Sequence, residues 1–533
     1  MPSIIVRNLP DFSAATTKKL QGDSDRRVYA AGERRIAPMN QCGFRPAGGN
    51  ASDEAPSPIL SEVSESAQMG EIFGVSFLEV LGEWAMPALT KRSPKFRLEF
   101  VANKSHSVHG GLPAIEALCQ QFGLWEKLRA VPGLDCRKRK TQGYSGELIV
   151  AQLLYSLTSG GGSLADAERL NEEPLAKQLA RVPAFADQTT VGEWLRAQSP
   201  GSIAGFWKVI EEFVSWVLER ADARRWTYCG RGEVFFDDTQ IEVSGPSFEG
   251  AKINYEGNLA LSWQTFWWGP FLLEAQLDSP GDVSSALPGM LERHRALWKK
   301  QGSDFLADSG SSAGVYLNAI SKAEFTHWSV SYNKWVDPLE RLAAAQPEAV
   351  WSQPLPAKWR DGSVIAEQHC RVRYQPEGCQ EPQTFAVVRF KRDDEFFWNY
   401  RFLACDANRP DASAIFARHR LKGDKENQIK EVLRGLDLHH PPCAELNANR
   451  MFYAIAALAY NVLIGLKLLH LPDDCQNWQL KTLLRQVLLM PAKLVKHARV
   501  LVARVQVPTA WLFWWRTVMS RLWLQPQVGR PSQ

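Results

Sequence analysis

The sequence lacks the cysteine pattern of a secreted or zinc-binding protein. Its 533 residues include nine cysteines, but they form no CxxC pair and no close pairs. This excludes a disulfide framework and a Cys-rich zinc site, and it indicates reduced thiols in the cytosol. The N-terminal stretch MPSIIVRNLPDFS also lacks the basic start and the long apolar run of a secretory signal. We therefore expect a cytoplasmic protein.

Long apolar runs and nucleotide-binding loops are missing as well. The longest apolar run, Met451 to Leu466, falls short of the roughly 18 to 20 residues of a membrane span and contains Asn461, so it predicts a buried helix. No GxxxxGK[ST] motif occurs. We expect neither a membrane partner nor a nucleotide cofactor.

Acidic residues are absent from the C-terminal end of the chain. After Asp474 there is no acid, whereas nine lysines and arginines follow. Such a tail suits a polyanionic partner, although a basic helix exposed to solvent explains it equally well. The net charge of +4, with 45% hydrophobic and 23% charged residues, is otherwise ordinary for a globular protein.

The length and the changes of pattern predict several domains. Residues 1–104 begin with a stretch rich in Ser, Ala, Gly and Pro and predict a disordered or weakly structured leader. Residues 105–228 have helical periodicity, as in GELIVAQLLYSLTSGG, where apolar residues lead into a glycine stop. This predicts a helical N-terminal domain that binds a partner rather than catalysing a reaction.

The pattern changes near Tyr228. Three strand-like runs (233–243, 258–266 and 271–277) are followed by a helix from about 287, a strand ending at Asp308, a helix and another strand. This order predicts a mixed α/β sheet over 229–345, completed by helices over 400–470. Residues 346–399 are rich in β-branched and aromatic residues and predict a β-rich insertion domain. Residues 471–533 predict a basic helical C-terminal region.

The stretch EVFFDDTQIEVSG places two carboxylates, Asp237 and Asp238, inside an expected strand. Aspartate is depleted in strands and is almost never fully buried unless it is paired or bound to a metal. The position therefore asks for a chemical reason.

Two more acids stand at comparable places. Asp308 follows a later strand and precedes a Ser-Gly turn, and Glu426 opens a helix whose apolar stripe includes Ile429 and Leu433. At 100° per residue Glu426 lies about 60° from Ile429 and about 20° from Leu433, at the edge of the buried face. Three such carboxylates can hold two divalent cations about 4 Å apart, and hard oxygen ligands favour Mg²⁺ or Mn²⁺. Glu426 is equally consistent with an acid stabilised by the helix dipole.

The motifs FFDDTQIEVSG, FLADSG and HRLKGDKENQIKE occur in that order, with the β-rich stretch before the last. In this they resemble the DDE transposases of bacterial insertion sequences, in the branch with a ribonuclease-H-like core and an inserted β domain. HSVHGGLPAIEALCQQFGL and SLADAERLNEEPLAKQL resemble the family's helical, DNA-binding N-terminal region, and LNANRMFYAIAALAYNVL resembles its helix after the catalytic core. The resemblance covers roughly residues 105 to 480.

The resemblance implies the site residues. Its Asp-x-Thr pattern places the first catalytic, metal-binding acid at Asp237, with Asp238 as the alternative, and the other two at Asp308 and Glu426. The last family motif carries Tyr, Arg, Glu and Lys. Its Tyr and Arg positions are His419 and Lys422 here, and its Lys position is Leu433. Lys in place of Arg keeps the charge but loses bidentate phosphate geometry.

Lys430 and Arg434 can compensate for this altered motif as DNA contacts; they are equally consistent with solvent-facing helix cations.

The resemblance also implies the function. A DNA transposase would use two Mg²⁺ or Mn²⁺ ions to hydrolyse strands at terminal inverted repeats, and the freed 3′ hydroxyl would attack target DNA. It would act as a homodimer in the synaptic complex and be nucleoid-associated when DNA-bound. The altered motif keeps an alternative open, a catalytically decayed, transposase-derived DNA-binding protein. A related nuclease that cuts without joining is a third hypothesis.

Three tryptophans and one basic run are further candidates for contacts with DNA. In some relatives a tryptophan stacks on a flipped base, and Trp267, Trp268 and Trp398 lie near the relevant regions, although core packing explains most tryptophans. The basic run Arg137 to Lys140 suggests a phosphate contact, and an exposed loop explains it as well.

Overall fold

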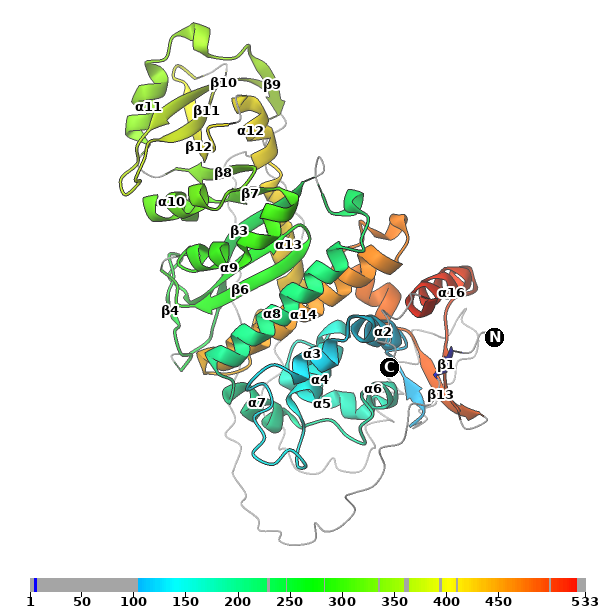
Figure 1. Cartoon of the computed structure of the whole chain (residues 1–533). Helices are drawn as coiled ribbons and strands as arrows, with labels where there is room; N and C mark the ends of the chain where they lie inside the picture. Colours follow the sequence, from blue (N-terminus) through cyan, green and yellow to red (C-terminus); the bar gives the residue numbers. More distant parts are fainter. Residues whose placement is uncertain are drawn as a thin grey trace, which may run out of the picture. The chain divides into compact units, whose positions relative to one another are not determined.

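The computed structural model describes residues 4–6, 104–227, 231–245, 247–281, 283–333, 336–358, 364–392, 395–408, 411–497 and 500–524 (Figure 1). The expected leader at 1–104 therefore lies almost entirely outside the described residues. Its described part, strand β1 (Ile4–Val6), pairs antiparallel with strand β14 (Val500–Val505).

Residues 112–218 form a succession of helices, drawn in blue to green in Figure 1. The helices are α2 (Leu112–Phe122), α3 (Leu124–Arg129), α4 (Gly146–Thr158), α5 (Leu164–Arg169), α6 (Pro174–Ala180), α7 (Gln188–Arg196) and α8 (Pro200–Leu218). Local signals set their ends. Gly123 ends α2 in the left-handed conformation, with φ of 75°. Ser199 begins α8 with a capping box to Ser202, followed by Pro200 in the first turn.

A mixed sheet follows in the order that the sequence predicts. Its strands and helices are β3 (Gly232–Glu242), the short β4 (Lys252–Ile253), β5 (Leu259–Trp268), β6 (Phe271–Asp278), α9 (Leu287–Gln301), β7 (Ser303–Ala307), α10 (Gly314–Lys322) and β8 (His327–Tyr332). The antiparallel ladder of β3, β5 and β6 meets the parallel pairs β3–β7 and β7–β8. The prediction of a mixed α/β sheet is confirmed.

The β-rich stretch that we expected as an insertion domain extends this same sheet. After α11 (Asp337–Ala344) come β9 (Leu355–Lys358), β10 (Val364–Tyr374), β11 (Gln383–Lys391) and β12 (Asn399–Cys405). Strand β12 pairs with the edge of β8, so the ten-stranded sheet runs β4-β5-β3-β7-β8-β12-β11-β10-β9, with β6 beside β5. An unpaired edge of β8 would leave backbone groups open to pairing, and β12 satisfies them. Helix α12 (Ala412–His419) covers β11 and β12 with a small core of its own.

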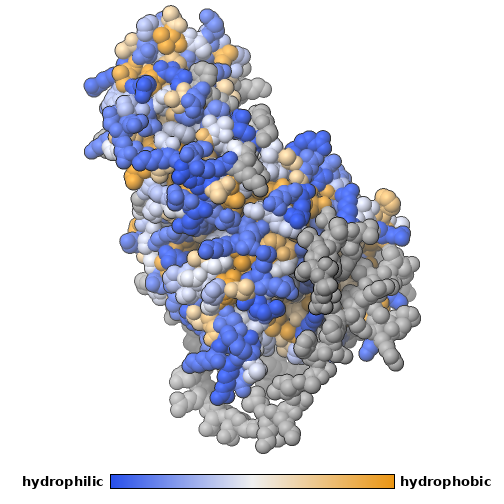
Figure 2. All heavy atoms as spheres, in the orientation of Figure 1, coloured by the Kyte–Doolittle hydropathy of each residue, from blue (hydrophilic) through white to orange (hydrophobic). Residues whose placement is uncertain are grey.

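Two helices after the sheet carry the rest of the core. Helix α13 (Lys422–Gly435) holds Glu426, and α14 (Leu446–His470) runs along β6 and α8. Asn461 of α14 is fully buried, and its side chain bonds both the N–H and the C=O of Leu272 in β6, at 3.0 and 2.7 Å. Among the described helices, α14 is long and apolar enough to cross a membrane, yet 89% of its most apolar window is buried inside the protein. Figure 2 shows mostly hydrophilic side chains on the visible face, with apolar ones in small separate groups.

The C-terminal region differs from the helical prediction. Between α15 (Leu480–Leu483) and α16 (Thr509–Leu524) lie the strands β13 (Ala492–His497) and β14. They form a four-stranded sheet, β1-β14-β13-β2, with β2 at His106–Ser107. The helical prediction was wrong for this segment because it relied on the basic residues. The stretches KLVKH and VLVARV are rich in valine, which favours strands, and they pair with each other.

Candidate active site

Two of the predicted acids follow paired positions of adjacent parallel strands. Phe236 of β3 lies opposite Ala307 of β7, so Asp237 and Asp308 are the next residues along the two strands. Asp308 directly follows β7 and accepts the backbone N–H of Ser309 at 2.7 Å, which begins a 3₁₀ turn. Because the two strands are parallel and adjacent in this register, the two acids lie side by side where β7 ends and β3 continues.

The third acid, Glu426 of α13, is linked to Asp308 by a lysine that pairs with both. The Lys422 Nζ lies 3.1 Å from Asp308 Oδ2 and 2.8 Å from Glu426 Oε1, one helical turn further along. The side chain of Lys422 is 9% exposed, while those of Asp308 and Glu426 are 48% and 44% exposed. Asp237 interacts electrostatically with all three. The structure therefore brings Asp237, Asp308 and Glu426 together around one ammonium group.

The electrostatics of this group favour a cation. Burial raises the pKa of Asp237 to about 7, and the carboxylates of Asp308, Asp238 and Glu426 add to the shift, with Lys422 opposing it. Burial also opposes ionisation of Asp308, but Lys422 and the backbone N–H of Ser309 together hold the pKa of Asp308 below its ordinary value. One ammonium thus faces several carboxylates, and negative charge is in excess.

The donor set fits Mg²⁺ or Mn²⁺, which prefer carboxylate oxygens. Nevertheless, within the described ranges no three His, Cys, Asp or Glu side chains converge closely enough to hold a metal ion as they stand. The Lys422 ammonium pairs with both Asp308 and Glu426. The chemistry of the oxygens suits the metal, and two of the three acids are engaged by this lysine.

Asp238, the alternative first acid, points to the other face of β3 because successive strand residues alternate. Its carboxylate accepts hydrogen bonds from Gln240 at 2.8 Å and from Ser262 at 3.4 Å. Burial raises the pKa of Asp238 too, and these two donors oppose the shift.

A second pair of acids lies four residues earlier on the same strands. Glu233 and Asp304 are direct register partners on β3 and β7. The Arg418 guanidinium at the end of α12 binds both, Glu233 at 2.6 Å and Asp304 at 3.1 Å, and Lys425 of α13 binds Glu233 at 3.0 Å. Burial opposes ionisation of Glu233, but Lys425 and Arg418 hold its pKa below the ordinary value.

This buried ion layer joins the helices beside Glu426 to the strands that carry Asp237 and Asp308. Sequence reasoning missed it. The available signal was an acid four residues before Asp237 and another four residues before Asp308.

The family model described as Transposase DDE domain group 1 matches residues 272–522. The chain carries a DDE transposase domain of the insertion-sequence type. The match begins in β6 and ends in α16, so it includes Asp308 and Glu426, while β3 with Asp237 precedes it. No curated protein matches the chain.

The remaining predicted residues of this transposase lie on α12 and α13. His419 is buried, and its ring nitrogens each lie 2.8 Å from a serine hydroxyl of β8, Ser329 and Ser331. Burial lowers the pKa of His419 to about 4, so the ring is neutral near pH 7. Lys430 and Arg434 are exposed one turn apart on α13. The stripe predicted for α13 is confirmed, since Ile429, Val432, Leu433 and Leu436 are all buried.

The three tryptophans considered as base-stacking candidates differ in exposure. Trp267 and Trp268 are buried in β5 at 0% and 3% exposure, so they pack in the core. Trp398 is 37% exposed beside β12, and the Arg389 guanidinium lies 4.4 Å from its ring centroid. Of the three, only Trp398 presents a ring to solvent.

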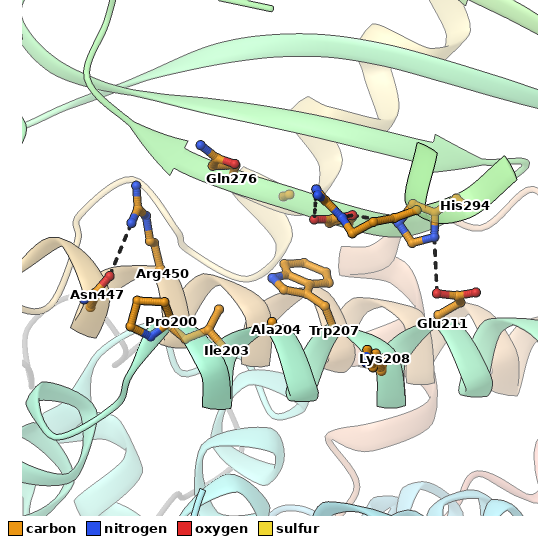
Figure 3. Close-up of a pocket in the computed structure, with 13 residues that line it drawn as sticks. Pro200, Ile203, Ala204, Trp207, Lys208, Glu211, Gln276, His294, Asn447 and Arg450 are labelled. Atoms are coloured by element: carbon orange, nitrogen blue, oxygen red, sulfur yellow. Dashed lines mark hydrogen bonds and ion pairs between the residues drawn. The ribbon is translucent and has the colours of Figure 1, made fainter. Parts of the chain in front are cut away.

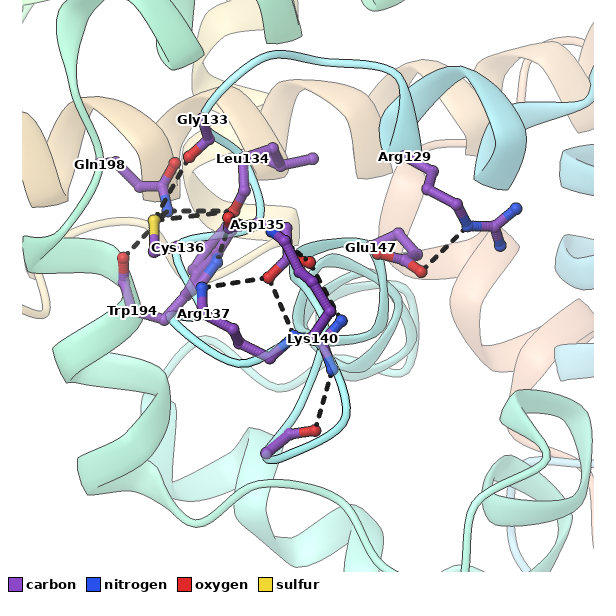
Figure 4. Close-up of polar contacts among 11 residues, drawn as sticks. Arg129, Gly133, Leu134, Asp135, Cys136, Arg137, Lys140, Glu147, Trp194 and Gln198 are labelled. Carbon is purple, nitrogen blue, oxygen red and sulfur yellow. Dashed lines mark hydrogen bonds and ion pairs between the residues drawn. The ribbon is translucent and has the colours of Figure 1, made fainter. Parts of the chain in front are cut away.

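The basic loop of the helical region is partly neutralised (Figure 4). Arg137 and Lys140 both bind the carboxylate of Asp135, each at 2.9 Å. Lys138 and Arg139 are exposed. Two of the four predicted cations therefore hold the loop together, which leaves the other two as candidate phosphate contacts.

A pocket of about 400 Å³ lies where α8 faces β6, α9 and α14 (Figure 3). Trp207 forms part of its wall, and His294 bridges Glu274 at 2.7 Å and Glu211 at 3.3 Å. Burial opposes protonation of His294, but the two glutamates raise its pKa above the ordinary value. The charged bridge ties the helical region to the sheet.

Proposed function

We propose that this chain is a DNA transposase that performs cut-and-paste transposition at terminal inverted repeats. The observation that carries the proposal is the meeting of Asp237, Asp308 and Glu426 around a single ammonium group, with the pKa of Asp237 raised to about 7. Perturbed carboxylates at one edge of a sheet are typical of a functional site. The transposase DDE domain supplies the reaction class. The order β5-β3-β7-β8 supports a ribonuclease-H-like core.

The proposed site would hold two Mg²⁺ or Mn²⁺ ions through Asp237, Asp308 and Glu426. Bound there, the ions would activate the attacking oxygen and stabilise the leaving oxygen at the scissile phosphate. Asp237 would bind from the sheet, and Glu426 would approach from α13. The exposed Lys430 and Arg434 would contact phosphates along the helix.

The proposed partners are double-stranded DNA and a second copy of the chain. The terminal inverted repeats would be bound first and the target DNA afterwards, within a homodimeric synaptic complex. Residues 105–228 would supply a helical DNA-binding domain, and the cytoplasm would be the site of action. The exposed Lys138 and Arg139 of that domain support a phosphate contact.

Cleavage of duplexes that carry the element's own ends tests the proposal. Asp237→Asn and Asp308→Asn should each lower cleavage about a hundredfold or more, because metal ions contribute several kcal/mol to such reactions. Binding of the ends should be retained. Asp238→Asn is the matched control on the same strand and should cut much faster than Asp237→Asn. Cleavage by Asp308→Asn at the wild-type rate contradicts the proposal.

The second candidate is a catalytically decayed DNA-binding protein. Two observations favour it: His419 donates and accepts only within the fold, and Leu433 is buried where the resemblance implies a lysine. Wild-type protein that binds inverted repeats tightly but never nicks them with Mn²⁺ would establish this candidate. A strand-transfer assay separates a transposase from a nuclease that only cuts.

A further inference from the structure

Lys422 is the counter-ion shared by the candidate metal ligands. Its ammonium contacts Asp308 at 3.1 Å and Glu426 at 2.8 Å, and the charge of Asp237 also stabilises it. The other cations of this region are engaged elsewhere, since Arg418 and Lys425 bind Glu233 in the layer below. In the described part of the chain, every ion pair of Asp308 and Glu426 is made with Lys422.

The ammonium and a metal ion compete for the same oxygens. Asp308 Oδ2 and Glu426 Oε1 each give a lone pair to Lys422, and these are oxygens that a divalent ion would need. Two positive centres cannot both occupy the space between the two carboxylates without strong repulsion. This accounts for carboxylates that are electrostatically coupled and yet form no ready metal cluster among the described residues.

Lys422 lies at the very start of its helix. It is the first residue of α13, so no preceding helical turn packs over its side chain. A lysine is a point charge on a flexible four-carbon stem, so it can change partner without moving the backbone. The carboxylates it binds are nearly half exposed, which brings solvent and a polyanion within reach of the ammonium.

We propose that the Lys422 ammonium occupies the metal site in the free protein. When a DNA duplex binds, a phosphate pairs with the ammonium and displaces it from the carboxylates. Metal binding and DNA binding are then coupled through one side chain, and each tightens the other by the same factor. The inference rests on the proposed function, because it takes the three acids as the metal ligands. Its consequence is that the free protein binds the divalent ion weakly and the DNA-bound protein binds it well.

Titration of the full chain with Mn²⁺ without DNA, followed by the loss of the free-ion spin-resonance signal, tests this directly. Lys422→Met should bind Mn²⁺ about tenfold more tightly than wild type, as expected for removal of two partly exposed ion pairs that the metal must break. Lys299→Met removes a half-exposed lysine of α9 that pairs with Glu324, away from the three acids, and should match wild type. Lys422→Arg keeps the charge and should bind no more tightly than wild type. Lys422→Gln repeats the test with a polar side chain if the Met variant does not fold.

Addition of a short duplex of arbitrary sequence at low salt completes the experiment. The duplex should tighten Mn²⁺ binding to wild type and to Lys299→Met, but should change it little in Lys422→Met. Equal Mn²⁺ affinity of wild type and of the neutral variants Lys422→Met and Lys422→Gln without DNA overturns the inference and leaves the proposed function standing. Failure of every protein to bind Mn²⁺, with and without DNA, overturns the proposed function itself.

Discussion

Replacing Arg418 with methionine should destabilise the protein strongly, because it removes the central cation of the buried ion layer. The guanidinium is 4% exposed and binds Glu233, 11% exposed, and Asp304, 3% exposed. Methionine fills similar space but leaves two buried carboxylates without their shared partner. Breaking a buried ion pair in this way costs about 3–5 kcal/mol.

The remaining ion pairs of the two carboxylates narrow the expected loss of stability. Glu233 retains Lys425 at 3.0 Å, and Asp304 retains Arg231 at 3.0 Å. We therefore expect the lower end, about 3 kcal/mol, which is roughly a hundredfold change in the unfolding equilibrium constant. Arg418→Lys keeps one charge but loses the bidentate fork, so its loss should be smaller.

Urea unfolding followed by far-ultraviolet circular dichroism measures the change in the free energy of unfolding. The matched control is Arg224→Met, which removes an arginine paired with Asp222 at 2.6 Å but 90% exposed. This control should leave the urea midpoint unchanged, because exposed ion pairs contribute little. A loss below about 1 kcal/mol in Arg418→Met would refute the reasoning that the buried layer is held by its charges.

Three further outcomes are expected. The glutamates raise the pKa of His294, so the stability they add is complete below the ordinary value of 6.5 and is lost as the pH rises through the raised value. The urea midpoint of wild type should fall as the pH rises over that range. An equal fall of the midpoint with pH in His294→Gln would be evidence against the charged bridge. Lys138→Ala combined with Arg139→Ala should reduce the salt dependence of DNA affinity by about two counterions, while Arg137→Ala, whose partner is internal, should change it less; an unaltered slope in the double variant removes the loop from the interface. Asn461→Leu should cost about 2–4 kcal/mol in urea unfolding, because two buried backbone groups lose their partner, and a neutral effect would show that they find another.

The sequence by itself determined the succession of secondary structure and the positions of the candidate acids along it. The alternation around Asp237, the Ser-Gly turn after Asp308 and the apolar stripe beside Glu426 are local patterns, and local patterns are set by the chain's own periodicity. For the same reason the buried helix around Asn461 was predictable from its length and composition.

Only the tertiary structure decided which distant residues meet. The strands β9 to β11 join the main sheet through β12, which pairs with the edge of β8. Strands β13 and β14 pair with each other and are flanked by β1 and β2 from the start of the chain. The position of Lys422 between Asp308 and Glu426, and that of Arg418 between Glu233 and Asp304, likewise depend on where two helices cross the ends of two strands. Charge pairing acts through space rather than along the chain, so a periodicity of two or 3.6 residues carries no information about it.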